Sequence, residues 1–138
     1  MSINLSRRFF IVEKGLFTAS TFTSGRILPI EGVNVYISRE NEGGEELLFA
    51  LKTDENGNTQ VVELDAPDME LSENPGNYRP FSVYNVRAVK DGFFRTIIKD
   101  VQVFANRTTQ QNIDMIPLPE NIQNIDTTNT FVVLPQNL

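Results

Sequence analysis

The chain has 138 residues, a mass of 15.6 kDa and a formal net charge of −6, which is the usual size of one globular domain. It has no cysteine and no histidine, so disulfides, thiolate nucleophiles, imidazole bases and zinc sites built from these ligands are excluded. We therefore expect one non-enzymatic domain with no cofactor and no metal.

The chain begins with an apolar and basic segment, which we take as an N-terminal arm of residues 1–14. Its sequence SRRFF at residues 6–10 resembles the start of a twin-arginine export signal, but Glu13 and Lys14 interrupt the apolar stretch that must follow. We expect no signal peptide, and the lack of cysteine leaves the compartment open. Phe9, Phe10 and Ile11 are the predicted interaction residues of this arm.

Apolar and polar residues alternate along most of residues 16–115, and no window shows a helical stripe. A first strand is predicted at residues 16–23. The second starts after Gly32, with inward side chains from Val33, Val35 and Ile37. Residues 39–45 form a polar hairpin loop with paired glycines, and the strand after it turns Leu47, Phe49 and Leu51 inward. Val62 and Leu64 lie on the core side of a fourth strand.

Acidic residues concentrate between Glu40 and Glu73. This stretch holds 11 of the 18 acidic residues and only one of the 12 basic residues, Lys52, so its charge is −10 and that of the remaining chain is +4. A nucleic-acid site requires clustered lysine and arginine, so we expect no nucleic-acid partner. The acidic stretch indicates a solvated end or a site for a cation or a basic partner.

The second half of the chain continues the strand pattern. Residues 66–80 are rich in proline and lack periodicity, which predicts a crossover loop between two sheets. Tyr84, Val86 and Ala88 share one face of the next strand. Residues 94–104 give one strand or a bent pair, and residues 109–116 give the last strand, which stops at Pro117. Seven strands in about 100 residues predict a Greek-key β-sandwich over residues 15–119.

Residues 120–138 form a C-terminal arm, a polar linker followed by a short segment with strand propensity. The predicted interaction residues of this arm are Phe131, Val132, Val133 and Leu134. Such a segment adds to an open sheet edge, either in its own chain or in a neighbouring copy, where it acts as a donor strand.

An ordered series of motifs carries a family resemblance: TDENGNT at 53–59, LDAP at 64–67, YNVRA at 84–88, DGF at 91–93, VQVF at 101–104 and MIPLP at 115–119. The series resembles the transthyretin-like, carboxypeptidase-regulatory-like sandwich domain found beside catalytic modules in clostridial spore-cortex-lytic and peptidoglycan-hydrolysing enzymes. The resemblance implies an accessory module. The catalytic branch of that fold, the hydroxyisourate hydrolases, depends on histidines that this chain lacks.

Three further candidate sites compete with plain structural roles. Pilin and adhesin sandwiches form a Lys–Asn isopeptide bond, for which Lys14 and Asn112 are candidates, although the Tyr84 strand has no glutamate to assist it. The turn after Thr53 offers oxygen ligands for calcium, but its glycine is misplaced for an EF-hand loop, which favours an ordinary hairpin turn. Possible sugar-stacking aromatics, for which packing is the competing role, are Tyr36, Phe93 and Phe94.

The leading hypothesis is a non-catalytic structural or interaction module, accessory to cell-wall or spore machinery. One alternative is a self-assembling subunit of a filament, coat or particle that uses its arms as donor strands. The other is a glycan-binding module. The expected partner is a protein or a second copy of the chain, with peptidoglycan as a further candidate. No apolar run approaches the roughly 20 residues of a membrane helix, so no membrane partner is expected.

Overall fold

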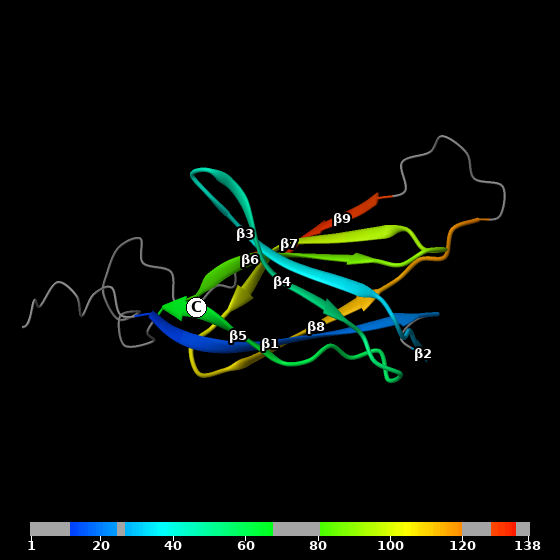
Figure 1. The fold of residues 1–138 in the computed structure, drawn as a ribbon, viewed down its shortest axis with the longest axis horizontal. Helices are drawn as coiled ribbons and strands as arrows, with labels where there is room; N and C mark the ends of the chain where they lie inside the picture. Colours follow the sequence, from blue (N-terminus) through cyan, green and yellow to red (C-terminus); the bar gives the residue numbers. More distant parts are fainter. Residues whose placement is uncertain (1–11, 25–26, 68–80, 120–127, 135–138) are drawn as a thin grey trace, which may run out of the picture.

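The computed structural model describes residues 12–24, 27–67, 81–119 and 128–134. All regular elements in this part of the chain are strands, and they form two packed sheets (Figure 1), which confirms the predicted all-β sandwich. The strands are β1 (Val12–Thr23), β2 (Leu28–Pro29), β3 (Asn34–Asn41), β4 (Gly44–Lys52), β5 (Val62–Pro67), β6 (Ser82–Val89), β7 (Arg95–Val103), β8 (Thr108–Asp114) and β9 (Thr128–Val132).

The seven predicted segments correspond to β1 and to β3 through β8, and β2 and β9 are additional among the described residues. In the first sheet, β1 is central: β5 and β2 pair with the two ends of one edge, and β8 pairs in parallel with the other edge. The second sheet has the order β4-β3-β6-β7-β9. The chain changes sheet between β5 and β6, where a crossover was predicted; residues 68–80 of that segment lie outside the described residues.

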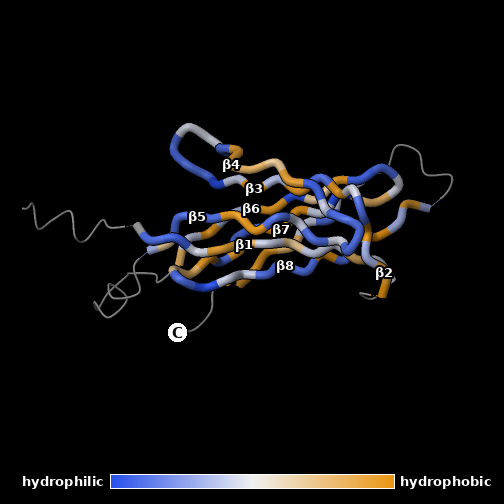
Figure 2. Tube along the Cα trace, turned by 60° about the horizontal axis from the view of Figure 1, so that its bottom comes forward, coloured by the Kyte–Doolittle hydropathy of each residue, from blue (hydrophilic) through white to orange (hydrophobic). Residues whose placement is uncertain are grey.

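Alternating side chains from both sheets meet in one core. Hydrophobic and hydrophilic residues alternate along the strands in Figure 2, as strand geometry requires when one face is buried. The residues predicted to point inward from the second and fifth predicted strands, which correspond to β3 and β6, are nearly or fully buried. The core residues of these strands and their partners include Val33, Val35, Ile37, Val62, Leu64, Tyr84, Val86, Ala88, Val101, Val103, Ile113 and Met115.

The inward face predicted for β4 is wrong at Leu47, whose side chain is 55% exposed. The register shifts between Ile37 and Ser38, which pair with Phe49 and Leu47, so Leu48 is an extra residue in β4. A bulge of one residue moves the following side chains to the other face. Leu48 and Phe49 therefore both pack partly against the core, while Leu47 faces solvent.

The hairpin between β3 and β4 is tighter than the predicted seven-residue loop. The two strands continue to Asn41 and Gly44, leaving Glu42 and Gly43 as the two turn residues. Of the paired glycines, Gly44 has a positive φ of 116°. Cross-strand contacts extend the ladder, because Arg39 pairs in register with Glu46. The prediction placed these strand ends wrongly because it relied on residue polarity, and an exposed two-stranded ribbon can be polar on both faces.

Strand β7 is one bent strand, which decides between the two predicted possibilities. The bend lies at Asp100, with a φ of 61°, and its amide donates to Asn85 Oδ1 on β6 at 3.3 Å. The pairing of β6 with β7 shifts register at the same place. This bend increases the local twist of the sheet next to β9.

Strand β1 passes unusually close to the end of β7. A Cβ on Gly15 would lie 2.4 Å from the carbonyl oxygen of Phe104 and 2.5 Å from Val103 Cγ1. Only glycine permits this approach, because both distances are far below van der Waals contact. Gly15 thus lets the chain close one end of the sandwich.

Candidate functional site: the open edges of the sandwich

The predicted interaction residues of the C-terminal arm lie at the outer edge of the second sheet. Strand β9 pairs in parallel with β7, and Phe131 is in register with Ile98. Beyond the strand, Val133 N donates to Lys99 O at 2.8 Å, and Gln102 Nε2 donates to Leu134 O at 2.8 Å. Within the described residues, the segment therefore pairs with its own chain. Of the other arm, Phe9, Phe10 and Ile11 lie outside the described residues.

The attachment of β9 uses few buried side chains. Val133 packs against the core, but Phe131, Val132 and Leu134 are 52%, 55% and 79% exposed. Most of the attachment is therefore backbone hydrogen bonding along the β7 edge, which depends little on side-chain identity.

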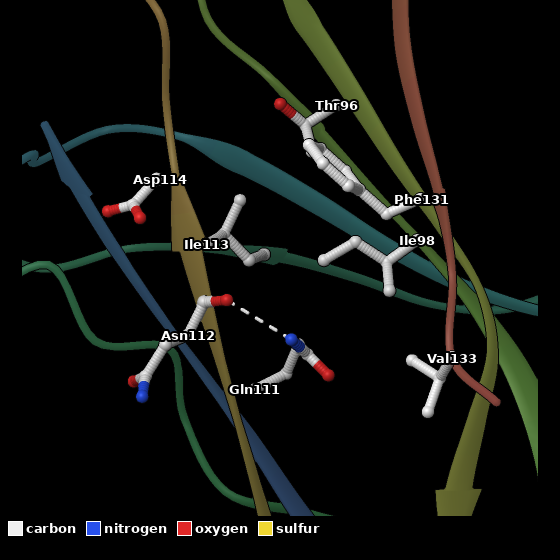
Figure 3. Close-up of a pocket in the computed structure, with 8 residues that line it drawn as sticks. All are labelled: Thr96, Ile98, Gln111, Asn112, Ile113, Asp114, Phe131 and Val133. Atoms are coloured by element: carbon white, nitrogen blue, oxygen red, sulfur yellow. Dashed lines mark hydrogen bonds between the residues drawn. The ribbon is translucent and has the colours of Figure 1, made fainter. Parts of the chain in front are cut away.

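A groove of about 240 Å³ lies between β9 and β8, where the two sheets open to solvent. Figure 3 shows Ile98, Ile113, Phe131 and Val133 around this space, whereas Asn112 and Asp114 on β8 point away from it. The Phe131 ring lies beside Thr96 and Ile98. The surface of the groove is thus mainly apolar, and the C-terminal segment supplies two of the lining side chains, Phe131 and Val133.

The opposite edge of the second sheet is β4, which pairs with β3 alone among the described strands. A smaller opening of about 220 Å³ lies between β4 and the first sheet, and charged side chains line it. Arg39 Nε binds Glu46 Oε1 at 3.1 Å, Arg39 Nη1 lies 3.8 Å from Asp65 Oδ2, and Lys14 forms an ion pair with Asp65. An ion-pair network therefore bridges the two sheets on this side.

The network changes the acidity of two of its members. The pKa of Arg39 is raised, first by its hydrogen bond to Glu46 and also by the charges of Glu46 and Asp65. The pKa of Tyr84 is raised above 10.0, first by burial of the phenol and then by the negative charge of Asp65. The Tyr84 hydroxyl donates to the backbone carbonyl of Asp65. Both shifts favour the protonated forms, so these groups act as fixed donors rather than as bases.

The turn proposed for calcium is an ordinary turn. Asp54 Oδ1 accepts hydrogen bonds from the amides of Asn56 and Asn58 at 2.9 and 3.0 Å. Gly57 has a φ of 80°, and Asn58 Oδ1 accepts a hydrogen bond from Ser20 Oγ at 2.6 Å. The oxygens thus stabilise the turn, as the competing interpretation predicted. Among the described residues, no three carboxylates converge on a point where a metal ion fits.

The aromatic residues considered for sugar stacking are all partly covered. Phe93 packs against the core, and Phe94 is half-buried. Tyr36 lies on the outer face of the second sheet beneath Arg87, whose guanidinium carbon is 5.5 Å from the ring centre. A stacking platform needs open ring faces, so these residues do not form one.

The proposed isopeptide pair is not brought together. Asn112 lies opposite Ser20 in the ladder of β1 with β8, whereas Lys14 lies six residues earlier in β1, beside Asn106. Six strand residues span about 20 Å. Lys14 is also exposed and paired with Asp65. The structure thus agrees with the argument against this pair, because the register of the parallel strands β1 and β8 keeps Lys14 and Asn112 apart.

Sequence reasoning missed Gln102. Gln102 is 5% exposed, and its Oε1 has no hydrogen-bond partner among the described residues, although its Nε2 donates to the C-terminal segment. A polar residue between Val101 and Val103 reads as an outward, solvated side chain. It is buried because β9 and the residues after it cover that edge, and no local pattern encodes such coverage.

Within the described part of the chain, no helix has the length and apolarity to cross a membrane. Among the titratable groups that line the β4 opening, Asp65 is paired with Lys14 and Arg39 and its carbonyl accepts a hydrogen bond from Tyr84, whereas Glu63 is exposed. The outer strands β4 and β9 and the apolar groove beside β9 are the candidate recognition features of the second sheet.

Neither protein-family models nor curated proteins match the sequence. Among solved structures, the chain is similar to the Bacillus anthracis TIE protein, with a TM-score of 0.49 and 15% identity over 77% of this chain and 17% of that chain. It is also similar to GBS52, the minor pilin of Streptococcus agalactiae, with a TM-score of 0.50 and 13% identity over 83% of this chain and 49% of that chain. This chain spans less than half of either protein, and the likeness to GBS52 shows a shared β-sandwich fold.

Proposed function

We propose that the chain is a non-catalytic structural and interaction module that binds its partner by strand addition at the sheet edges. The observation that carries this proposal is the attachment of Thr128–Val132 to β7. That edge accepts an added strand through its backbone, with Val133 anchored in the core and three neighbouring apolar side chains left exposed. An edge that binds one extended segment in this way has the chemistry to bind another.

The arms give the module its own supply of such segments. A copy that donates an arm to a neighbouring sheet makes a head-to-tail contact, which extends into a chain of copies unless the rotation closes it. A self-assembling subunit is therefore the form of this function that the edges support best. The accessory role in cell-wall or spore machinery rests on the family resemblance of the sequence motifs, and peptidoglycan is the ligand to test for it.

A strand-exchange experiment tests the proposal. Val133→Pro removes the amide that donates to Lys99 O and loosens the segment. The variant is then titrated against a fluorescent peptide of residues 127–138, with Val133→Ala, which keeps the amide, as the control. We expect the proline variant to bind the peptide and the alanine variant to bind it far more weakly. A proline variant that is folded but does not bind the peptide would contradict strand addition at this edge.

Light scattering tests the role of the arms directly. Full-length protein is compared with a chain limited to residues 15–119, and both are incubated with insoluble peptidoglycan. Oligomers that need the arms support assembly by strand donation. A monomer that sediments with peptidoglycan, with or without arms, supports the glycan-binding alternative instead.

A further inference from the structure

We propose that the bare edge of β4 receives the N-terminal arm of a second copy of this chain. The inference rests on the proposed function and names the donor and the acceptor. The second sheet has two outer strands, β4 and β9, and the side of β7 that faces away from β6 is already paired with β9 of the same chain. The other edge, β4, pairs only with β3 among the described strands, so its outward backbone groups have no strand partner there.

The β4 edge has a specific chemistry. Leu47 is 55% exposed, and its neighbours Leu48 and Phe49 pack against the core but are only partly buried. Acidic side chains surround this apolar stretch on β3, β4, β5 and the turn between β3 and β4: Glu40, Glu42, Glu45, Glu46 and Glu63 are all exposed. The edge thus combines an open ladder, an apolar stretch and negative charge.

The negative charge of the β4 edge indicates which kind of segment can bind there. Two β4 edges joined in parallel would set Glu45 and Glu46 against the same residues of the other copy, and two joined antiparallel would offer these glutamates one cation, Lys52. A segment with basic and apolar residues has the opposite character. The first 11 residues of the chain carry Arg7 and Arg8, no acidic residue, and Phe9, Phe10 and Ile11 in succession. No other segment of the chain combines two arginines with three consecutive large apolar residues.

The length of the arm and its starting point favour a second copy. Eleven extended residues span about 36 Å, which exceeds the roughly 30 Å of the nine-residue β4. β1 begins at the end of the sandwich where the β3–β4 hairpin projects (Figure 1), and β4 runs from there toward the opposite end. To lie on its own β4, the arm would have to reverse next to Val12. The run RRFFIVEK at residues 7–14 contains no glycine, proline, asparagine, aspartate or serine to make that turn.

Charge reversal tests the proposal on the full chain. Arg7→Glu/Arg8→Glu and Glu45→Lys/Glu46→Lys are each compared with the wild type by light scattering over a concentration series. We expect the wild type to form species above 15.6 kDa and each double variant to lose them. Combining all four changes reverses both sides of the contact and restores the association. Unchanged association in either double variant, no restoration in the quadruple variant, or a wild type that stays at 15.6 kDa at every concentration would overturn the proposal.

Matched controls separate this contact from a general effect of charge. Arg87→Glu/Arg107→Glu changes the net charge as the arm variant does, at exposed residues of β6 and of the turn between β7 and β8, and Glu31→Lys/Glu55→Lys matches the edge variant at exposed residues elsewhere. Both controls should associate like the wild type. Circular dichroism and thermal unfolding verify that every variant is folded, so a loss of mass reports on the contact.

Cross-linking locates the arm. The natural chain has no cysteine, so Ser6→Cys and Leu47→Cys are the only thiols in a mixture of the two variants. A short bismaleimide should join them into a heterodimer, whereas Ser6→Cys with Thr130→Cys on β9 should give much less product. Linkage at Thr130 instead would refute the β4 site and leave strand addition standing. Linkage within a dilute double-cysteine chain would show that the arm lies on its own sandwich, which also refutes the proposal.

Discussion

The inner strands and the outer strands of the second sheet are held by different forces. β3 and β6 have neighbours on both sides, and their inward side chains Ile37 and Val86 are fully buried. Among the described strands, β9 and β4 each have one neighbour, and Phe131, Val132 and Leu47 on them are more than half exposed. The inner strands are thus fixed by packing, whereas the outer strands are fixed mainly by backbone ladders. This difference suits the outer strands to exchange partners without loss of the fold.

Truncation of a core side chain should give the largest effect. Ile37→Ala removes a fully buried side chain, so we expect the free energy of unfolding to fall by about 2 to 5 kcal/mol. Val132→Ala on β9, where the side chain is 55% exposed, should change it by less than about 0.5 kcal/mol. Urea unfolding measures both. Similar losses in the two variants would break the distinction between inner and outer strands.

Release of β9 from β7 should lower the free energy of unfolding by less than the core truncation does. Its effect should stay at that edge of the sheet. Val133→Pro removes one backbone hydrogen bond, worth about 1 kcal/mol, and should speed amide exchange along β9 and the outer edge of β7. Amides of β3 and β6 should keep their protection. Hydrogen exchange measured by mass spectrometry distinguishes the regions, and collapse of protection in β3 would show that β9 belongs to the cooperative core.

Replacement of Gln102 should have a smaller effect. Gln102→Leu loses the bond to Leu134 O but also removes an unpaired buried oxygen, so stability should change by less than about 1 kcal/mol. Gln102→Glu keeps the shape, loses the donor and buries a carboxylate, so it should be the more destabilising of the two. Thermal unfolding compares them. Equal losses would mean that the donated hydrogen bond dominates at this edge.

The stability of the protein should depend on pH through Tyr84, which lines the opening beside β4. The pKa of Tyr84 is raised, chiefly by burial, so folding favours the neutral phenol. This contribution is fully present below the unfolded-state pKa near 10 and is lost as the pH rises from there through the folded-state pKa. Tyr84→Phe should therefore flatten the alkaline fall in melting temperature, with Tyr36→Phe as the control. An unchanged alkaline profile in Tyr84→Phe would exclude the phenol as its source.

Much of the fold could be predicted because the alternation of apolar and polar residues along a strand shows which side chains are buried. Val33, Val35 and Ile37 lie on the core face, and the segment after Thr53 is a turn, as its composition indicated, although it joins β4 to β5 in the other sheet and is not a hairpin. The alternation predicted the wrong face for Leu47, because a one-residue bulge in β4 shifts the pattern there. It also misread the hairpin ends, because an exposed two-stranded ribbon has no buried face to mark its length.

The candidate site was predicted only as a pair of β-prone arms. The segment at residues 130–134 was recognisable from its composition, and its position on β7 follows from the tertiary fold. Neither the burial of Gln102 nor the links of Arg39 to Glu46 and Asp65 had a local signal. These contacts join residues that only the packing of the sheets brings together.

The sequence by itself determined the class of the fold, the position of most core side chains and the exclusion of histidine and cysteine chemistry, because these follow from residue type and a period of two. Only the tertiary structure decided which strands are edges, which edge the C-terminal segment covers and which edge carries exposed acidic residues. Strand order and register arise from contacts between distant segments, and no local pattern contains them.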